Sequence, residues 1–242
     1  MLLLDMKQKQ MMNKRNNTMQ TYEWVLFDAD ETLFTFDAFK GLQLAFARYG
    51  VTFSKQEHDE YEAINQPLWV EYQNGKITAD ELQLRRFQKW ADQLQKSHKE
   101  LNSVFLTAMA EVCMPLDGAI QILDTFKGKI KLGIITNGFI EHQQHRLKRH
   151  GLENHFDLLI TSEEAGFAKP HRGIFDHALT LMGQPTRETV LMVGDNPASD
   201  ILGGINSGLH TCWLNPKKKP TPDGITPHYQ ISSLRELLSI IG

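Results

Sequence analysis

Trp24-Val-Leu-Phe-Asp28-Ala-Asp30-Glu-Thr32 is the stretch on which the fold prediction rests. Its first four residues are apolar and include β-favouring side chains, a pattern typical of a short strand buried on both faces. Strands of that kind occur mainly in parallel sheets that helices cover. Asp28 then stands at the carboxyl end of the strand. Ligands bind at that edge of open α/β sheets, because strand ends and helix starts leave a crevice there.

Two acids, Asp28 and Asp30, follow this expected strand. Carboxylates so close together repel each other unless a cation lies between them or one of them is protonated. Mg²⁺ suits such a site, because it prefers oxygen ligands and is commonly held by one or two carboxylates plus a substrate phosphate. A polar turn after a core strand is the competing interpretation, and the two acids alone do not decide between the two.

The composition is that of an ordinary globular chain. Its 242 residues, 41% hydrophobic and 23% charged, allow a sizeable core in one large or two small domains. A net charge of −3 gives no electrostatic sign of a nucleic-acid or anionic membrane partner. We expect neither nucleic acid nor membrane as a partner, and a monomer or weak homo-oligomer.

The two cysteines, Cys113 and Cys212, lie far apart among apolar neighbours. This suits buried, reduced thiols and indicates a cytoplasmic protein. The chain begins without the basic segment and long apolar run of a signal peptide or membrane span. Residues 1–20 are rich in Gln, Asn, Lys and Met, and we expect a disordered or loosely held tail there.

Residues 38–113 carry long amphipathic patterns and no convincing strand. Ser54-Lys-Gln-Glu57 and Thr78-Ala-Asp-Glu81 are capping boxes, in which the hydroxyl and the carboxylate satisfy free amides at a helix start. Asn74-Gly75 between them indicates the end of one helix. The pattern predicts a helical bundle of about four members.

From Pro115 onward, expected strands and helices alternate with short connections. We expect strands at 130–136, 158–161, 190–194 and 209–214, helices near 118–126, 140–150, 174–182 and 198–207, and a last helix after Ser233. This order predicts an α/β fold with a doubly wound, Rossmann-like parallel sheet. The expected domains are the tail at 1–20, an α/β core of 21–37 and 114–242, and an inserted helical cap at 38–113.

Later strand ends carry polar groups suited to a phosphate or a cation. Thr136 and Asn137 precede a helix start, where free amides can hold a phosphate, although a simple helix cap uses the same residues. Lys169 could neutralise both acids and phosphate, although an exposed lysine is usually only solvated. Asp195 ends another buried strand, and Asp200 follows it. We expect these groups to meet at one edge of the sheet.

The ordered set Asp28-x-Asp30-x-Thr32, Thr136, Lys169-Pro170 and Gly194-Asp195-x₄-Asp200 resembles the four motifs of the haloacid dehalogenase superfamily. The resemblance covers about residues 22–242, and the helical block resembles that superfamily's cap of the first type. The stretches 65–75, 135–139 and 200–208 are also similar to bacterial pyrimidine 5′-nucleotidases that clear non-standard nucleotides as well.

The resemblance implies a role for each matching residue. Asp28 would be the nucleophile that forms an aspartyl-phosphate, and Asp30 would protonate the leaving oxygen and then activate water. Mg²⁺, with Mn²⁺ or Co²⁺ as substitutes, would be held by the Asp28 carboxylate, the Asp30 backbone carbonyl and Asp195, with Asp200 behind them. The transferring phosphoryl group would be bound by Thr136, Asn137 and Lys169.

The second acid favours phosphate ester hydrolysis, because the halide-displacing members of the superfamily lack it and halide needs no proton on leaving. We therefore expect a Mg²⁺-dependent phosphomonoester hydrolase acting on pyrimidine nucleoside 5′-monophosphates such as UMP, dUMP, dTMP and 5-substituted analogues. Alternatives are a phosphatase of phosphoglycolate or a sugar phosphate, and a transferase that uses the same intermediate. A non-enzymatic receiver-like phospho-acceptor is a further alternative, but there the Lys-Pro motif comes last.

Substrate choice is expected to reside in the helical block, because the motifs recognise only the phosphoryl group. Asn65, Gln66 and Gln73 are candidates for reading the pyrimidine edge. We interpret the helically spaced aromatic residues Trp69, Tyr72 and Phe87 as core of the bundle rather than as a base-stacking surface. We interpret His142 and His145 as a solvated helix face rather than as a metal site.

Overall fold

The computed structural model describes residues 21–242, so the expected tail at 1–20 lies outside the described residues. Within 21–242, six parallel strands form one sheet in the order β3-β2-β1-β4-β5-β6. The strands are β1 (Trp24–Phe27), β2 (Lys131–Thr136), β3 (Leu158–Thr161), β4 (Val190–Gly194), β5 (His210–Leu214) and β6 (Tyr229–Ile231). The predicted doubly wound sheet is confirmed. Only β6 was not predicted, since its three residues bury one side chain.

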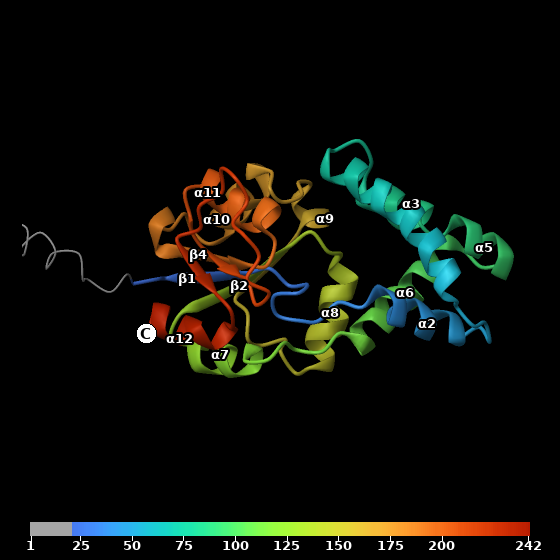
Figure 1. Ribbon diagram of the computed structural model, residues 1–242, viewed down its shortest axis with the longest axis horizontal. Helices are drawn as coiled ribbons and strands as arrows, with labels where there is room; N and C mark the ends of the chain where they lie inside the picture. Colours follow the sequence, from blue (N-terminus) through green and yellow to red (C-terminus); the bar gives the residue numbers. More distant parts are fainter. Residues whose placement is uncertain (1–20) are drawn as a thin grey trace, which may run out of the picture.

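Helices cover both faces of this sheet, because the side chains of β1 alternate between them. Val25 and Phe27 belong to a core that includes α7 (Ala119–Phe126) and α12 (Leu237–Ile241). Trp24 and Leu26 belong to a second core with α10 (Arg172–Leu181). Figure 1 shows α7 and α12 on one side of the strands and α10 and α11 (Leu202–Asn206) on the other. Burial on both faces is what the apolar run predicted.

The chain order creates the crevice that holds the site. From β1 the chain adds β2 and then β3 outward on one side, and it returns to place β4 on the other side of β1. The carboxyl ends of β1, β2 and β4 therefore face the point where the winding reverses, which is where ligands bind in such sheets. Helices α8 (Ile140–Arg149) and α9 (Ser162–Ala165) follow β2 and β3.

A block of helices is inserted between β1 and β2. Residues 38–113, all within the described part of the chain, form the five cap helices α2 (Ala38–Ala47), α3 (Lys55–Gln73), α4 (Ala79–Arg85), α5 (Gln88–Leu94) and α6 (His98–Val112). Both predicted capping boxes are present, and α3 ends at Gln73, directly before the break predicted at Asn74-Gly75. We predicted about four helices; the fifth arises because the helix that Thr78 starts is interrupted after Arg85.

The two connections to the cap helices lie side by side. The Thr35 amide donates to the Met114 carbonyl at 2.8 Å, and the Leu116 amide donates to the Leu33 carbonyl at 2.8 Å. Helix α6 also packs against α8 of the core (Figure 1). The cap helices are thereby held over the carboxyl ends of the strands. No helix within residues 21–242 is long and apolar enough to cross a membrane.

Candidate active site

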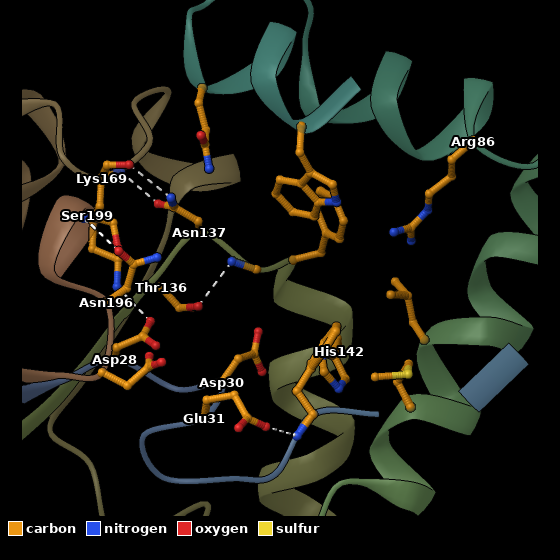
Figure 2. A pocket seen from close by; sticks show the side chains of 18 of the residues that line it. Asp28, Asp30, Glu31, Arg86, Thr136, Asn137, His142, Lys169, Asn196 and Ser199 are labelled. Carbon is orange, nitrogen blue, oxygen red and sulfur yellow. Dashed lines mark hydrogen bonds and ion pairs between the residues drawn. The ribbon is translucent and has the colours of Figure 1, made fainter. Parts of the chain in front are cut away.

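A cavity of about 280 Å³ lies between the strand ends and the cap helices (Figure 2). Six residues that the sequence predicted for the site line it. They lie at or after the carboxyl ends of β1, β2, β3 and β4: Asp28, Asp30, Thr136, Asn137, Lys169 and Asp195. Asp200 is not part of the lining, but it is buried and in contact with it. The sheet thus brings together the separate motifs.

Lys169 lies at the centre of the polar network and is only 2% exposed, which excludes a merely solvated lysine. Its Nζ is 2.6 Å from Asp28 Oδ1 and 2.8 Å from Asp200 Oδ1, and it donates to the Ile135 carbonyl at 2.8 Å. Burial alone would lower the pKa of Lys169, but Asp200 and Asp28 outweigh it and raise the pKa. Asn137 fixes the Lys169 backbone through two hydrogen bonds of 2.7 and 3.0 Å.

Carboxylate oxygens of Asp28, Asp195 and Asp200 lie within 4.8 Å of one another. Burial, and after it the charge of Asp200, raises the pKa of Asp195 to about 6. Burial raises the pKa of Asp28 to about 7, although Lys169 opposes this. Within residues 21–242, Lys169 is the one cation that forms ion pairs with these acids. The excess negative charge and the all-oxygen donor set fit a divalent cation of the Mg²⁺ type.

The close approach of Asp200 depends on a glycine. A Cβ atom at Gly194 would lie 2.3 Å from Asp200 Oδ2. Asp200 in turn accepts hydrogen bonds from the Asn196 amide and the Ser199 hydroxyl, both at 3.0 Å. With Lys169 as a further partner, Asp200 is well placed to hold the loop after β4 in position.

Asp30 has a partner that the sequence analysis did not predict, Arg146 of α8. Arg146 is fully buried, and its Nη1 is 2.5 Å from Asp30 Oδ1. Its Nη2 donates to Gln143 Oε1 at 2.6 Å, and the guanidinium lies 4.4 Å from the centre of the Phe34 ring. Burial alone would raise the pKa of Asp30, but Arg146 and His142 outweigh it and lower the pKa. With no phosphate ester in the cavity, Arg146 therefore favours the carboxylate form of Asp30.

Two threonines shape the loops around the acids. The Thr136 hydroxyl accepts a hydrogen bond of 3.0 Å from the Gly138 amide. Helix α8 begins later, after Phe139, and has no side-chain cap. The alternative of a simple helix cap at Thr136 is therefore wrong. The Thr32 hydroxyl is buried and accepts the Asp195 amide at 3.0 Å, which ties the loop after β1 to the loop after β4.

His142 is buried and lines the cavity, so its interpretation as part of a solvated face is wrong. Burial, and after it Arg146, lowers the pKa of His142 to about 3, which leaves the imidazole neutral. Its Nε2 has no hydrogen-bond partner among the described residues. His145 packs beside Thr107, with its Nδ1 3.4 Å from the hydroxyl. The burial of His142 could not be predicted from the sequence, because α8 has too few apolar residues to indicate a buried face.

The cap helices contribute an aromatic wall. Trp69 lines the cavity and packs against Phe139 with ring centres 5.3 Å apart, so it is more than bundle core. Phe87 is buried core, as predicted, and Tyr72 donates to Ser162 at 2.7 Å. Of the three polar candidates Gln73 lines the cavity, whereas Asn65 and Gln66 do not. Arg86, which the sequence analysis did not single out, also lines it.

Residues 22–208 match a protein-family model described as haloacid dehalogenase-like hydrolase. The chain belongs to this family. Membership of the haloacid dehalogenase-like hydrolases agrees with the motif resemblance and excludes the receiver-like alternative.

Relatives of this hydrolase match nearly its whole length. The pyrimidine 5′-nucleotidase YjjG of Escherichia coli K12 is 54% identical over 220 residues, which are 91% of this chain and 98% of YjjG. The pyrimidine 5′-nucleotidase PynA of Streptococcus pneumoniae is 29% identical, over 91% of this chain and 95% of PynA. The crystal structure of Bacillus subtilis YfnB bound to magnesium has a TM-score of 0.75 and 32% identity, and covers 92% of this chain and 99% of that one.

Proposed function

We propose that this hydrolase is a Mg²⁺-dependent phosphatase of pyrimidine nucleoside 5′-monophosphates that works through an aspartyl-phosphate. The observation that carries the proposal is the geometry of one cavity, in which Asp28, Asp30 and an acidic cluster around Lys169 meet beneath an aromatic wall. The similarity to two pyrimidine 5′-nucleotidases supports the choice of substrate.

In the proposed reaction, a carboxylate oxygen of Asp28 attacks the phosphorus atom as the ester bond to the leaving oxygen breaks. The negative charge of the bound phosphate favours the protonated form of Asp30, which then gives its proton to that oxygen, so the alcohol leaves neutral. Water then attacks the phosphorus of the aspartyl-phosphate and gives a proton to Asp30, while the bond between phosphorus and the Asp28 oxygen breaks. This step releases inorganic phosphate and restores the Asp28 carboxylate. The ion pair with Arg146 fits the second half of the cycle, because it holds Asp30 as the carboxylate that accepts this proton.

The phosphoryl oxygens gain negative charge in the transition state, and fixed donors stabilise it. Lys169 Nζ lies against Asp28 and is suited to bind one of these oxygens. Thr136 accepts one hydrogen bond from Gly138, which leaves its O–H free to donate into the cavity. Asn137 holds the Lys169 backbone and thereby positions its charge.

Asp28, Asp195 and the Asp30 backbone carbonyl are the groups we propose to hold the metal, with Asp200 behind them. A bound Mg²⁺ would neutralise charge on the phosphoryl group and relieve the repulsion among the acids. Magnesium bound to YfnB supports this choice, and Mn²⁺ or Co²⁺ are expected to substitute.

Residues 38–113 are proposed to act as a cap domain over a core of 21–37 and 114–242, and to select the ester. Trp69, Gln73 and Arg86 reach the cavity from the cap helices. We expect the enzyme to act as a monomer or weak homo-oligomer. The free, buried cysteines support a cytoplasmic location.

The test is a comparison of kcat/KM for dUMP, dTMP, AMP, GMP and phosphoglycolate at one Mg²⁺ concentration. We expect the pyrimidine nucleotides to lead by at least about tenfold, which corresponds to roughly 1.4 kcal/mol of differential transition-state binding. A lead by phosphoglycolate or a purine nucleotide would refute the choice of substrate. If none of the five esters is hydrolysed, the phosphatase assignment is refuted.

A further inference from the structure

Arg86 is a buried cation without a counter-ion. It is 3% exposed, and within residues 21–242 no carboxylate forms an ion pair with it. Its hydrogen-bond acceptor is the neutral Asn102, whose Oδ1 takes bonds from Nε and Nη2. Tyr61 is a further polar neighbour. A guanidinium carries five N–H donors, so donors remain after Asn102 is satisfied.

A buried charge normally costs several kcal/mol unless it is paired. Here the faces of three aromatic rings compensate in part, with the guanidinium carbon 5.1 to 5.3 Å from the ring centres of Phe87, Phe105 and Phe139. The rings hold the cation in place but accept no conventional hydrogen bond. The arrangement therefore keeps charged donors in an apolar setting without an acceptor for all of them.

These donors face the candidate active site. Arg86 lines the same cavity as Asp28 and Lys169, and Figure 2 shows it reaching in from the cap helices on the side opposite Asp28. The surfaces between them are mostly flat and apolar, and they include Trp69 and Phe139. At about 280 Å³, the cavity lies just below the ~300–1,000 Å³ usual for ligand sites.

The geometry points to Arg86 as the residue that recognises the leaving group, by donating to a carbonyl oxygen of a pyrimidine base that lies against the aromatic wall. This inference rests on the phosphatase function proposed above and names the group that reads its substrate. Uracil and thymine carry two ring carbonyls and no amino group, which suits a residue that can only donate. Adenine offers no carbonyl.

A neutral base fits this cavity better than an anionic leaving group. The positive charge of Arg86 is already balanced in part by the three rings, and a carboxylate would lose its hydration against Trp69 and Phe139. The neutral His142, whose Nε2 lacks a partner among the described residues, is a further polar group that lines the cavity and adds no charge.

The experiment compares kcat/KM for UMP and for ribose 5-phosphate, which has the same phosphate and sugar but no base, in wild type and Arg86→Met. We expect a loss of roughly 10- to 100-fold with UMP, as for one charge-assisted hydrogen bond, and a change within about threefold with ribose 5-phosphate. Arg85→Met is the matched control. Arg85 is adjacent, half exposed and bound to Glu71, so this variant should match wild type on both esters.

Inhibition by uridine gives a readout that does not require chemistry. Its inhibition constant should rise by a similar factor in Arg86→Met and stay unchanged in Arg85→Met. If the methionine variant melts without cooperativity, Arg86→Lys replaces it in the same assays, because lysine keeps the charge but not the planar fork of donors. A selective loss with UMP in the lysine variant supports the inference.

Equal losses with UMP and ribose 5-phosphate, or no loss with either, overturn the role of Arg86 and leave the phosphatase function standing. If the wild type hydrolyses neither UMP nor ribose 5-phosphate, the proposed function is overturned and this inference with it.

Discussion

Replacing Arg146 with glutamine tests the ion pair that holds Asp30. The substitution removes the Nη1 contact of 2.5 Å with Asp30, the hydrogen bond to Gln143 and the contact of the guanidinium with the Phe34 ring. Arg149→Gln is the matched control, because Arg149 lies on the same helix and is exposed. Both variants lose one positive charge, but only the first breaks a buried contact.

The expected loss of stability in Arg146→Gln follows from the burial of the ion pair. Removing one partner of a buried ion pair costs about 3–5 kcal/mol, because the other charge is left without compensation. The Asp30 side chain is 30% exposed, so water can partly solvate the remaining carboxylate and the cost falls toward the lower limit. We expect Arg146→Gln to lower the free energy of unfolding by about 3 kcal/mol, and Arg149→Gln by less than about 0.5 kcal/mol.

Urea unfolding followed by circular dichroism measures this difference. With a slope of about 3 kcal/mol per molar, the midpoint of Arg146→Gln should fall by roughly 1 M. At saturating Mg²⁺ we also expect kcat to fall at least about tenfold, because a small misplacement of an acid–base group is costly. If Arg146→Gln stays within about 1 kcal/mol of wild type and keeps its kcat, Arg146 does not position Asp30.

The remaining predictions concern the acids and the thiols. Asp28→Asn should fold, as judged by circular dichroism, but lose at least about 10³-fold in kcat, since an amide cannot act as the nucleophile; a tenth of wild-type turnover would contradict the mechanism. Chelation should abolish activity, and Mg²⁺ at 100 times its Kd should stabilise the wild type by about 2.7 kcal/mol in thermal melts but leave Asp195→Asn nearly unchanged; an equal shift in both would exclude Asp195 as a ligand. Burial raises the pKa of Cys113 to about 11 and of Cys212 to about 12, so iodoacetamide at pH 8 should label neither in the native protein and both after denaturation, as mass spectrometry would show.

Much of the fold could be predicted because its signals are local. The apolar run from Trp24 to Phe27 predicted a strand buried on both faces, and the structure confirms it. The capping boxes at Ser54 and Thr78 predicted two helix starts, which the structure also confirms. Strand β6 and the break between α4 and α5 escaped prediction. Three residues with one buried side chain carry too little periodicity, and Arg86 with Phe87 continues a helix-like pattern.

The grouping of the site residues could also be predicted, because motifs at the carboxyl ends of parallel strands share one edge of the sheet. Asp28, Thr136, Lys169 and Asp195 could be placed together on that ground alone. The burial of two basic side chains, Arg146 and Arg86, could not be predicted in this way and is seen only in the folded chain. Arg146 reaches Asp30 across 116 residues of chain, and Arg86 is enclosed by rings from three different segments. Burial of a charge depends on every element packed around it, and no spacing within one helix records that.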